Sequence, residues 1–260
     1  LNLNFFDFFM KNKLCITVIF ISFIASYSPF AEEPQKETQN RFLVDLNLDP
    51  VFGFYPEIYV YYPLSKNIEL NFYATFWVSG IRDDSSTLAT EFGVGLDFKF
   101  FDGDLVLTPS IGIGSGNFQS GGGRPVVGDN IVPSLTADIE LFNKIHIEGM
   151  GIYWKSFRHE SKITNYLDQV EWLANAEYHI SDLFDVGIYM DQYLIYEFNN
   201  WWSDFYSVYL WFGPSIKVKV KNNYLWFSAG VDLIDYLDKT LPSNKKSFKD
   251  YYKLTANFEL

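Results

Sequence analysis

Apolar and polar residues alternate along this chain in twelve separate segments. The stretch Ile68–Val78 is the most regular, with apolar side chains at every even position and Glu, Asn, Tyr, Thr and Trp between them. A period of two sends successive side chains to opposite faces, so each segment is predicted to be a β-strand with one apolar face. The predicted strands are 42–48, 54–62, 68–78, 92–100, 105–114, 131–141, 145–154, 170–180, 186–195, 208–220, 225–233 and 252–260.

The connections between these strands alternate in length. Turns of three or four residues lie at 64–67, 101–104, 142–144, 181–184 and 221–223, and longer connections at 79–88, 115–130, 155–166, 197–204 and 235–250. An even strand number with short turns at one end is typical of bacterial transmembrane barrels, whose short turns face the periplasm. The pattern therefore predicts an all-β protein, a membrane-spanning antiparallel up-and-down β-barrel of about 12 strands. Aromatic residues, 20% of the chain, suit the belts at the two membrane surfaces.

The N-terminus carries the features of a secretory signal. Residues 1–9 lie upstream of Met10 and are interpreted as an extension outside the native protein. Two lysines precede an apolar core of twelve residues, which is too short to span a membrane, so residues 10–31 are predicted to be a signal peptide. We expect cleavage after Ala31, with Ser26 and Ser28 as alternatives. Residues 32–40 then form a short periplasmic lead, residues 41–260 form a single barrel domain, and the predicted location is the bacterial outer membrane.

Charge and cysteine usage exclude several classes of function. The one cysteine, Cys15, lies in the signal, so the exported chain has no thiol. Without the signal the chain has 31 acidic and 18 basic residues. This acidic balance argues against nucleic acid as a partner and against docking on anionic lipid. No cofactor is predicted.

Several motifs resemble a known family. They are NFYATFW at 71–77, GVGLDFKFFDG at 93–103, GGGRPVVGD at 121–129 with IVPSLT after it, and YKLT at 252–255. Together they resemble a family of uncharacterised, porin-like β-barrel proteins of the Gram-negative outer membrane. The resemblance covers most of the exported chain and implies fold and location. It implies no catalytic residue, because the family has no assigned activity.

The polar strand faces define a candidate lumen. They carry four lysines (Lys99, Lys217, Lys219 and Lys253) and thirteen acids (Asp45, Glu57, Glu69, Glu91, Asp97, Asp138, Glu140, Glu148, Glu171, Glu177, Asp191, Asp232 and Glu259). The lumen-lining candidates are Glu57, Glu91, Glu171, Asp191, Asp232, Lys217 and Lys219, and the first three together with Asp232 are expected at mid-lumen. Such a negative excess favours cations, so we predict a small passive pore for small solutes with a preference for cations.

Bulky residues on the same faces support a different reading. Tyrosine and tryptophan side chains are predicted to point inward at positions 59, 61, 73, 77, 189, 193, 209, 211 and 226. A barrel of twelve strands lies between filled barrels of eight and open channels of sixteen, so these rings can narrow or block the lumen. The alternative function is therefore a closed structural or adhesive barrel.

The glycine-rich connection 115–130 is a candidate constriction. Gly121, Gly122 and Gly123 allow unusual backbone shapes, and Arg124 can fork onto a lumen carboxylate. With Asp129 these residues form the candidate constriction loop, and the alternative is an ordinary surface loop. No Gly-Lys-Ser/Thr follows, so the stretch is not a phosphate-binding loop.

The three histidines raise the possibility of an enzyme. Only His159, beside Glu160 and Ser161, is placed near the outer leaflet, where a lipid-modifying hydrolase of the outer membrane would act. Adjacent residues rarely form a working triad, so this is the weaker alternative. His146 and His179 lie near the periplasmic rim, where polar contacts are favoured over a shared metal, and no metal site is predicted. The expected partners are outer-membrane lipid, lipopolysaccharide and small solutes or cations, and a lysine cluster in the connection 235–250 suits lipopolysaccharide phosphates.

Overall fold

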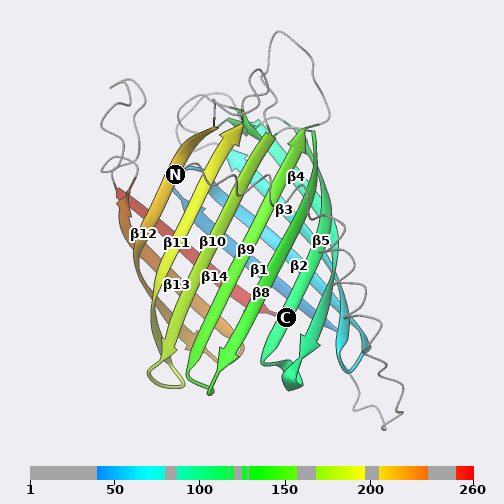
Figure 1. Cartoon of the computed structure of the whole chain (residues 1–260), viewed down its shortest axis with the longest axis vertical. Helices are drawn as coiled ribbons and strands as arrows, with labels where there is room; N and C mark the ends of the chain where they lie inside the picture. The colour runs from blue at the N-terminus through cyan, green and yellow to red at the C-terminus, as the bar shows by residue number, and fades with distance from the viewer. Residues whose placement is uncertain are drawn as a thin grey trace, which may run out of the picture. The chain divides into compact units, whose positions relative to one another are not determined.

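The computed structural model describes residues 40–79, 87–116, 118–119, 125–127, 129–156, 168–196, 205–233 and 250–260. These residues form a closed antiparallel barrel of twelve strands, in which each strand pairs with its neighbours along the chain and the first pairs with the last (Figure 1). The predicted fold class is confirmed. The segments predicted to be an extension, a signal peptide and a periplasmic lead lie outside the described residues.

The strand boundaries follow the sequence alternation closely. The barrel strands are β1 (Arg41–Asp49), β2 (Gly53–Ser65), β3 (Ile68–Ser79), β4 (Thr87–Phe100), β5 (Leu105–Gly116), β8 (Asn130–Leu141), β9 (Ile145–Ser156), β10 (Asp168–His179), β11 (Phe184–Tyr196), β12 (Phe205–Val220), β13 (Asn223–Asp232) and β14 (Asp250–Glu259). A one-turn 3-10 helix, η1 (Phe101–Gly103), joins β4 to β5. The predicted loop 115–130 contains a two-stranded hairpin, β6 (Phe118–Gln119) and β7 (Pro125–Val127).

The barrel has an apolar outside and a polar inside. Phe92 and Ile113 on the outer face are 55% and 61% exposed, whereas Glu91 and Asp97 on the inner face are only 4% and 6% exposed. A protein folded in water buries apolar side chains and exposes acids, so this arrangement is the reverse of a water-soluble one. It matches a barrel whose outer face contacts hydrocarbon and whose closed sheet leaves no backbone edge unpaired.

The two ends of the barrel differ. We call the end that carries the connections 64–67, 101–104, 142–144, 181–184 and 221–223 the short-turn end, and the opposite end the long-loop end (Figure 1). At the β8–β9 turn, Phe142 and Asn143 both have positive φ, 55° and 53°, and Lys144 N–H donates to Leu141 O at 3.0 Å. Two central residues with positive φ give the turn the twist that neighbouring antiparallel strands need.

Closure depends on the last strand. β14 pairs with β1 in the register Leu43↔Glu259 to Leu48↔Leu254, and Leu260 N–H donates to Phe42 O at 2.9 Å. This ladder closes the barrel.

One polar residue on the apolar face has a local explanation. Gln192 lies opposite Trp172 on β10, and its Oε1 accepts a hydrogen bond of 2.8 Å from the indole Nε1. The β11–β12 register shifts one residue further on, between Tyr193 and Leu194, which is a β-bulge. In the part of the chain that the structure describes, no helix is both long and apolar enough to cross a membrane.

Candidate functional site

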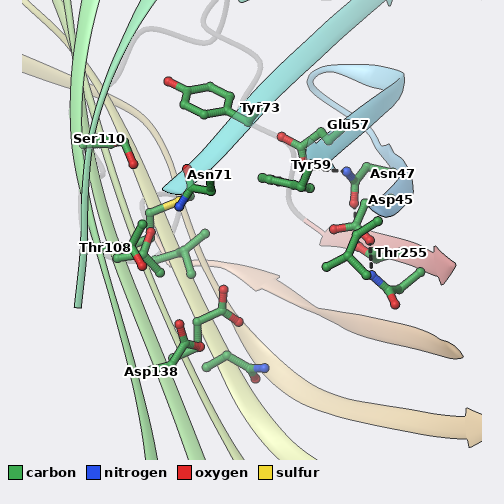
Figure 2. A pocket seen from close by; sticks show the side chains of 18 of the residues that line it. Asp45, Asn47, Glu57, Tyr59, Asn71, Tyr73, Thr108, Ser110, Asp138 and Thr255 are labelled. Carbon is green, nitrogen blue, oxygen red and sulfur yellow. Dashed lines mark hydrogen bonds between the residues drawn. The ribbon is translucent and has the colours of Figure 1, made fainter. Parts of the chain in front are cut away.

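The barrel interior contains a cavity of about 860 Å³ (Figure 2). It reaches the short-turn end, where Asp102, Gly103 and Asn222 line it. At the end nearer the long loops, Phe52 and Trp154 are among the last side chains that line the cavity. Ten carboxylates, four basic side chains and His146 line the cavity, together with six tyrosines and three tryptophans. The lining is therefore both acidic and aromatic.

One wall of the cavity holds carboxylates whose hydrogen-bond donors are neutral. Asp45 Oδ1 accepts from Asn257 Nδ2 at 2.6 Å, and Glu57 accepts from Asn47 Nδ2 at 2.8 Å and from Thr75 Oγ1 at 3.1 Å. Figure 2 shows Asp45, Asn47 and Glu57 grouped at one side of the cavity. Neutral amide and hydroxyl donors position these carboxylates without cancelling their charge.

The neighbouring strands β3 and β4 continue this wall. Glu91 accepts from the hydroxyl of Tyr73 at 2.7 Å and from Trp154 Nε1 at 2.9 Å. Asp97 accepts from Thr108 Oγ1 at 3.0 Å and also from the amide of Asn71. The acids of β1 to β4 that have only neutral donors thus form one negative wall.

Glu148 on β9 differs from these acids. It lines the cavity, yet its carboxylate has no hydrogen bond and no ion pair with any described residue. A carboxylate held in place only by its strand is available to whatever enters the lumen.

The basic side chains that line the cavity are all engaged. Arg41 and Lys99 each lie 2.7 Å from a carboxylate oxygen of Glu69. Lys217 pairs with Glu177, and Lys253 donates to the hydroxyl of Tyr189 at 3.0 Å and lies 3.8 Å from Asp191. The lumen cations therefore pair with a specific subset of acids, and among the described residues the acids of the β1–β4 wall and Glu148 have no ion-pair partner.

A tyrosine lies flat against the wall because two glycines leave room for it. A Cβ on Gly93 would lie 2.2 Å from Tyr73 Cε1, and a Cβ on Gly112 would lie 2.3 Å from the Tyr73 hydroxyl oxygen. Any side chain at either glycine would displace the ring, because real Cβ atoms do not approach so closely. The glycines thus keep the cavity wide at this level and aim the hydroxyl at Glu91.

Toward the long-loop end the interior is filled by what we call the aromatic layer: Phe52, Trp154, Tyr193, Tyr209, Trp211 and Tyr251, each at most 7% exposed. Tyr209 and Trp211 stack with centroids 3.9 Å apart, and Trp211 stacks on Tyr251 at 5.0 Å. Trp154 meets Tyr193 edge to face at 6.2 Å. The rings come from β9, β11, β12, β14 and the β1–β2 turn, so the layer joins strands from around the barrel.

The β1–β2 turn folds inward to complete the aromatic layer. Asp49 Oδ1 accepts the backbone N–H groups of Val51 and Phe52 at 2.8 and 2.6 Å, which fixes the turn. The Phe52 ring then meets Tyr55 at 5.8 Å and Tyr193 at 5.9 Å. A turn between two strands normally faces solvent, so two buried apolar residues at this tip indicate a plug-like role.

The structure places the predicted lumen residues in two groups. Glu57, Glu91, Glu171 and Lys217 line the cavity, whereas Asp191, Asp232 and Lys219 do not. Asp191 and Asp232 are 0% exposed. Asp232 is the last residue of β13 and accepts the backbone N–H of Leu210 at 3.0 Å, so it lies at a strand end and not at mid-lumen. Lys219 Nζ lies 2.7 Å from Asp185 near the short-turn end.

The predicted constriction loop is only partly described. Gly121, Gly122, Gly123 and Arg124 lie outside the described residues. Asp129 is 9% exposed and accepts from Ser115 Oγ at 3.0 Å, a contact that ties the two ends of the loop together.

The two described histidines make polar contacts with acids. His179 Nδ1 lies 2.8 Å from Asp185 Oδ1, and its Nε2 lies 3.1 Å from Glu140 Oε1. His146 lies 3.4 Å from Asp138 and 3.7 Å from Glu177. Over the described ranges, no group of three or more His, Cys, Asp or Glu side chains is arranged to hold a metal ion. His159 and the lysines of the connection 235–250 lie outside these ranges.

The aromatic layer includes residues that sequence reasoning missed. Phe52, Trp154 and Tyr251 were not among the predicted site residues, although all three help to close the interior. The available signal was Val51–Phe52, an apolar pair directly after Asp49–Pro50 in a turn where polar residues are usual.

The fold and the polar interior together define the class of protein, a membrane-spanning antiparallel β-barrel of twelve strands. A NanC porin has 11% sequence identity and a TM-score of 0.52, covering 84% of this chain and 100% of that chain. An outer membrane channel from Pseudomonas putida F1 has 11% identity and a TM-score of 0.50, covering 90% and 100%. KdgM porin has 10% identity and a TM-score of 0.49, covering 83% and 98%. At these identities the similarity shows the barrel fold alone.

The chain belongs to the Family of unknown function (DUF6733), whose model matches residues 10–260. The resemblance to an uncharacterised barrel family is thereby confirmed. No curated protein matches the sequence.

Proposed function

We propose that this barrel is a passive pore of the bacterial outer membrane for small solutes, with a preference for cations. One observation carries the proposal: ten carboxylates but four basic side chains line the cavity, and the bases are held by acids of their own. The negative β1–β4 wall and Glu148 therefore face whatever moves through the lumen. In a narrow lumen such charges raise the local concentration of cations and lower that of anions.

The expected size of this effect follows from Coulomb's law. A unit charge about 8 Å from an ion contributes about 0.5 kcal/mol in water, and screening at about 0.15 M salt reduces this to about 0.2 kcal/mol. Cations gain this energy and anions lose it, so two carboxylates change the ratio of cation to anion permeability by about fourfold.

The short-turn end would face the periplasm, as in other barrels of this kind. The expected partners are outer-membrane lipid and lipopolysaccharide on the outside and small solutes or cations in the lumen. A lipid-modifying hydrolase is a weaker alternative, because His146 and His179, the described histidines, contact acids near the short-turn end.

A second candidate function is a closed structural or adhesive barrel. The aromatic layer favours it, because Tyr193, Tyr209 and Trp211 are 0% exposed and stack where a pore would need to be open. A pore would require this layer to move, whereas a closed barrel would use it to stay rigid.

Planar-bilayer recording of the purified barrel in a salt gradient tests the proposal. We expect a reversal potential of the sign for cation preference. The double variant Glu57→Gln with Glu148→Gln should lower the ratio of cation to anion permeability by about fourfold, and its conductance should stay of the same order of magnitude. The matched control Asp182→Asn removes one charge from an exposed short turn outside the cavity lining and should leave the ratio unchanged.

Anion preference in the unmodified barrel, or an unchanged ratio in the double variant, would refute the role of lumen charge. Absence of current under all voltages would favour the closed barrel.

A further inference from the structure

Tyr59 on β2 lines the acidic part of the cavity. Asp45, Glu57 and Glu148, which belong to β1, β2 and β9, line the same cavity. Figure 2 shows Tyr59 beside Glu57 and Asn47, and Tyr73 lies opposite Tyr59 on the neighbouring strand β3. Asp45 and Glu57 accept hydrogen bonds from neutral donors, and Glu148 accepts none from the described residues.

Three other lumen tyrosines, Tyr61, Tyr189 and Tyr224, each have a cation of the protein itself over the ring. Arg41 lies 4.6 Å from the centroid of the Tyr61 ring, and Lys217 lies 5.0 Å from that of Tyr224. Lys253 lies 5.5 Å from the ring centroid of Tyr189. A cation over an aromatic face is attracted by the negative charge density of the ring. Of the described cations none covers Tyr59, whose ring neighbours are Tyr61 at 6.3 Å and Tyr73 at 6.5 Å.

We propose that the Tyr59 region of the lumen binds an organic cation, an aliphatic amine or diamine whose ammonium group takes the place that Arg41, Lys217 and Lys253 occupy over the other tyrosines. The proposal rests on the cation-preferring lumen proposed above and names its ligand class. The ammonium donates to Asp45, Glu57 or Glu148, and its methylene groups pack on the tyrosine rings. The cavity, about 860 Å³, has the size of small-molecule sites.

Other ligand classes fit this site less well. Anionic solutes meet a wall of uncompensated carboxylates. A neutral polyol can stack on the rings but gains nothing from the charge. A bare metal ion needs several converging ligands, and the described part of the chain offers no such group. The nearest lumen lysines have ion-pair partners outside the site: Lys217 pairs with Glu177, and Lys253 lies 3.8 Å from Asp191.

Isothermal titration calorimetry of the full-length barrel in detergent micelles tests the proposal, with 1,4-diaminobutane as the probe. Butane-1,4-diol is the uncharged control of the same length. We expect the diamine to bind and the diol to bind at least tenfold more weakly. Tyr59→Leu should weaken diamine binding by about tenfold, whereas Tyr59→Phe keeps the ring face and should stay within about twofold. Glu148→Gln should also weaken binding, without loss of any hydrogen bond within the described protein.

Tyr62→Leu is the matched control variant. It removes a tyrosine from the same strand, but one that is 53% exposed on the outer face and outside the cavity lining, so diamine affinity should stay within about twofold. Folding of each variant is checked by the change in its gel mobility on heating. If Tyr59→Leu does not fold, the two single variants Tyr59→Phe and Glu148→Gln still test the proposal.

Equal binding of diol and diamine would overturn the proposal. So would a diamine affinity that neither Tyr59→Leu nor Glu148→Gln changes, or one that Tyr62→Leu lowers as much as Tyr59→Leu. Because calorimetry in micelles needs no current, a barrel that binds the diamine but conducts nothing refutes the pore and leaves the binding site standing.

Discussion

Replacing Phe52 with alanine tests whether the inward β1–β2 turn closes the lumen. The ring is 7% exposed and meets Tyr55 and Tyr193 edge to face. Burial of such a ring contributes about 1.5–3 kcal/mol, and each edge-to-face pair adds about 0.5–1.5 kcal/mol. The sum, about 2.5–6 kcal/mol, spans the usual cost of Phe→Ala in a packed interior, about 3–5 kcal/mol.

Two measurements report the effect of Phe52→Ala. Urea unfolding of the barrel in lipid vesicles should show a free energy of unfolding lower by about 3 kcal/mol, the low end of the range, because the adjacent cavity lets the neighbours relax. Bilayer recording should show larger or more frequent conductance, because the layer has lost the residue that bridges β2 and β11.

Phe142→Ala is the matched control. Phe142 also lies in a hairpin turn, but at the short-turn end and 89% exposed. Its replacement should change the unfolding free energy by no more than about 0.5 kcal/mol and should leave conductance unchanged. Equal destabilisation by the two variants would refute the packing of Phe52, and a destabilised but equally conducting Phe52→Ala would refute the aromatic layer as the barrier.

Two further changes test the wall of the barrel. Gly93→Ala should lower the free energy of urea unfolding by about 1–3 kcal/mol, because its Cβ would lie 2.2 Å from the Tyr73 ring. Gly149→Ala should be close to neutral, because its Cβ has no neighbour nearer than 4.0 Å. Equal costs for the two variants would contradict this packing. Val94→Arg on the outer face should cost about 2–4 kcal/mol near the membrane midplane, and Thr136→Arg in the cavity lining should cost less; a reversed order would mean that the two faces are assigned wrongly.

The sequence predicted the barrel well because one physical constraint acts on every strand. Each strand separates hydrocarbon from a polar interior, so the sequence of each strand by itself alternates with a period of two. All twelve predicted strands are present in the structure. The main differences lie toward the long-loop end, where β4 begins at Thr87 and not at Phe92 and β12 begins at Phe205 and not at Val208. In barrels of this kind the strands extend beyond the membrane at the long-loop end, where no hydrocarbon imposes an alternation of apolar and polar residues.

The site was predictable only in part. Inward position follows from parity, so the local pattern identified Glu57, Glu91 and Glu171 as residues that line the cavity. Depth and partners depend on contacts between residues far apart in the chain, such as Phe52 with Tyr193 or Trp154 with Glu91. The periodicity of the sequence does not show which carboxylate pairs with a lysine and which accepts a hydrogen bond from an amide. The distinction between the negative wall and the neutralised acids therefore required the structure.

The pairing of β1 with β14 also bears on the order in which this molecule assembles. Every other ladder of the barrel joins strands that follow each other in the sequence, whereas this one joins Leu43–Leu48 to Leu254–Glu259. Bringing together segments at such a sequence distance carries the largest loop-closure entropy of any pairing in the molecule, and contacts of this kind form slowly. Hairpins can therefore form one after another along the chain, while the seam between the first and last strands is expected to be sealed last. Until then two unpaired edges face the membrane or a chaperone, and the molecule can still accept a foreign strand.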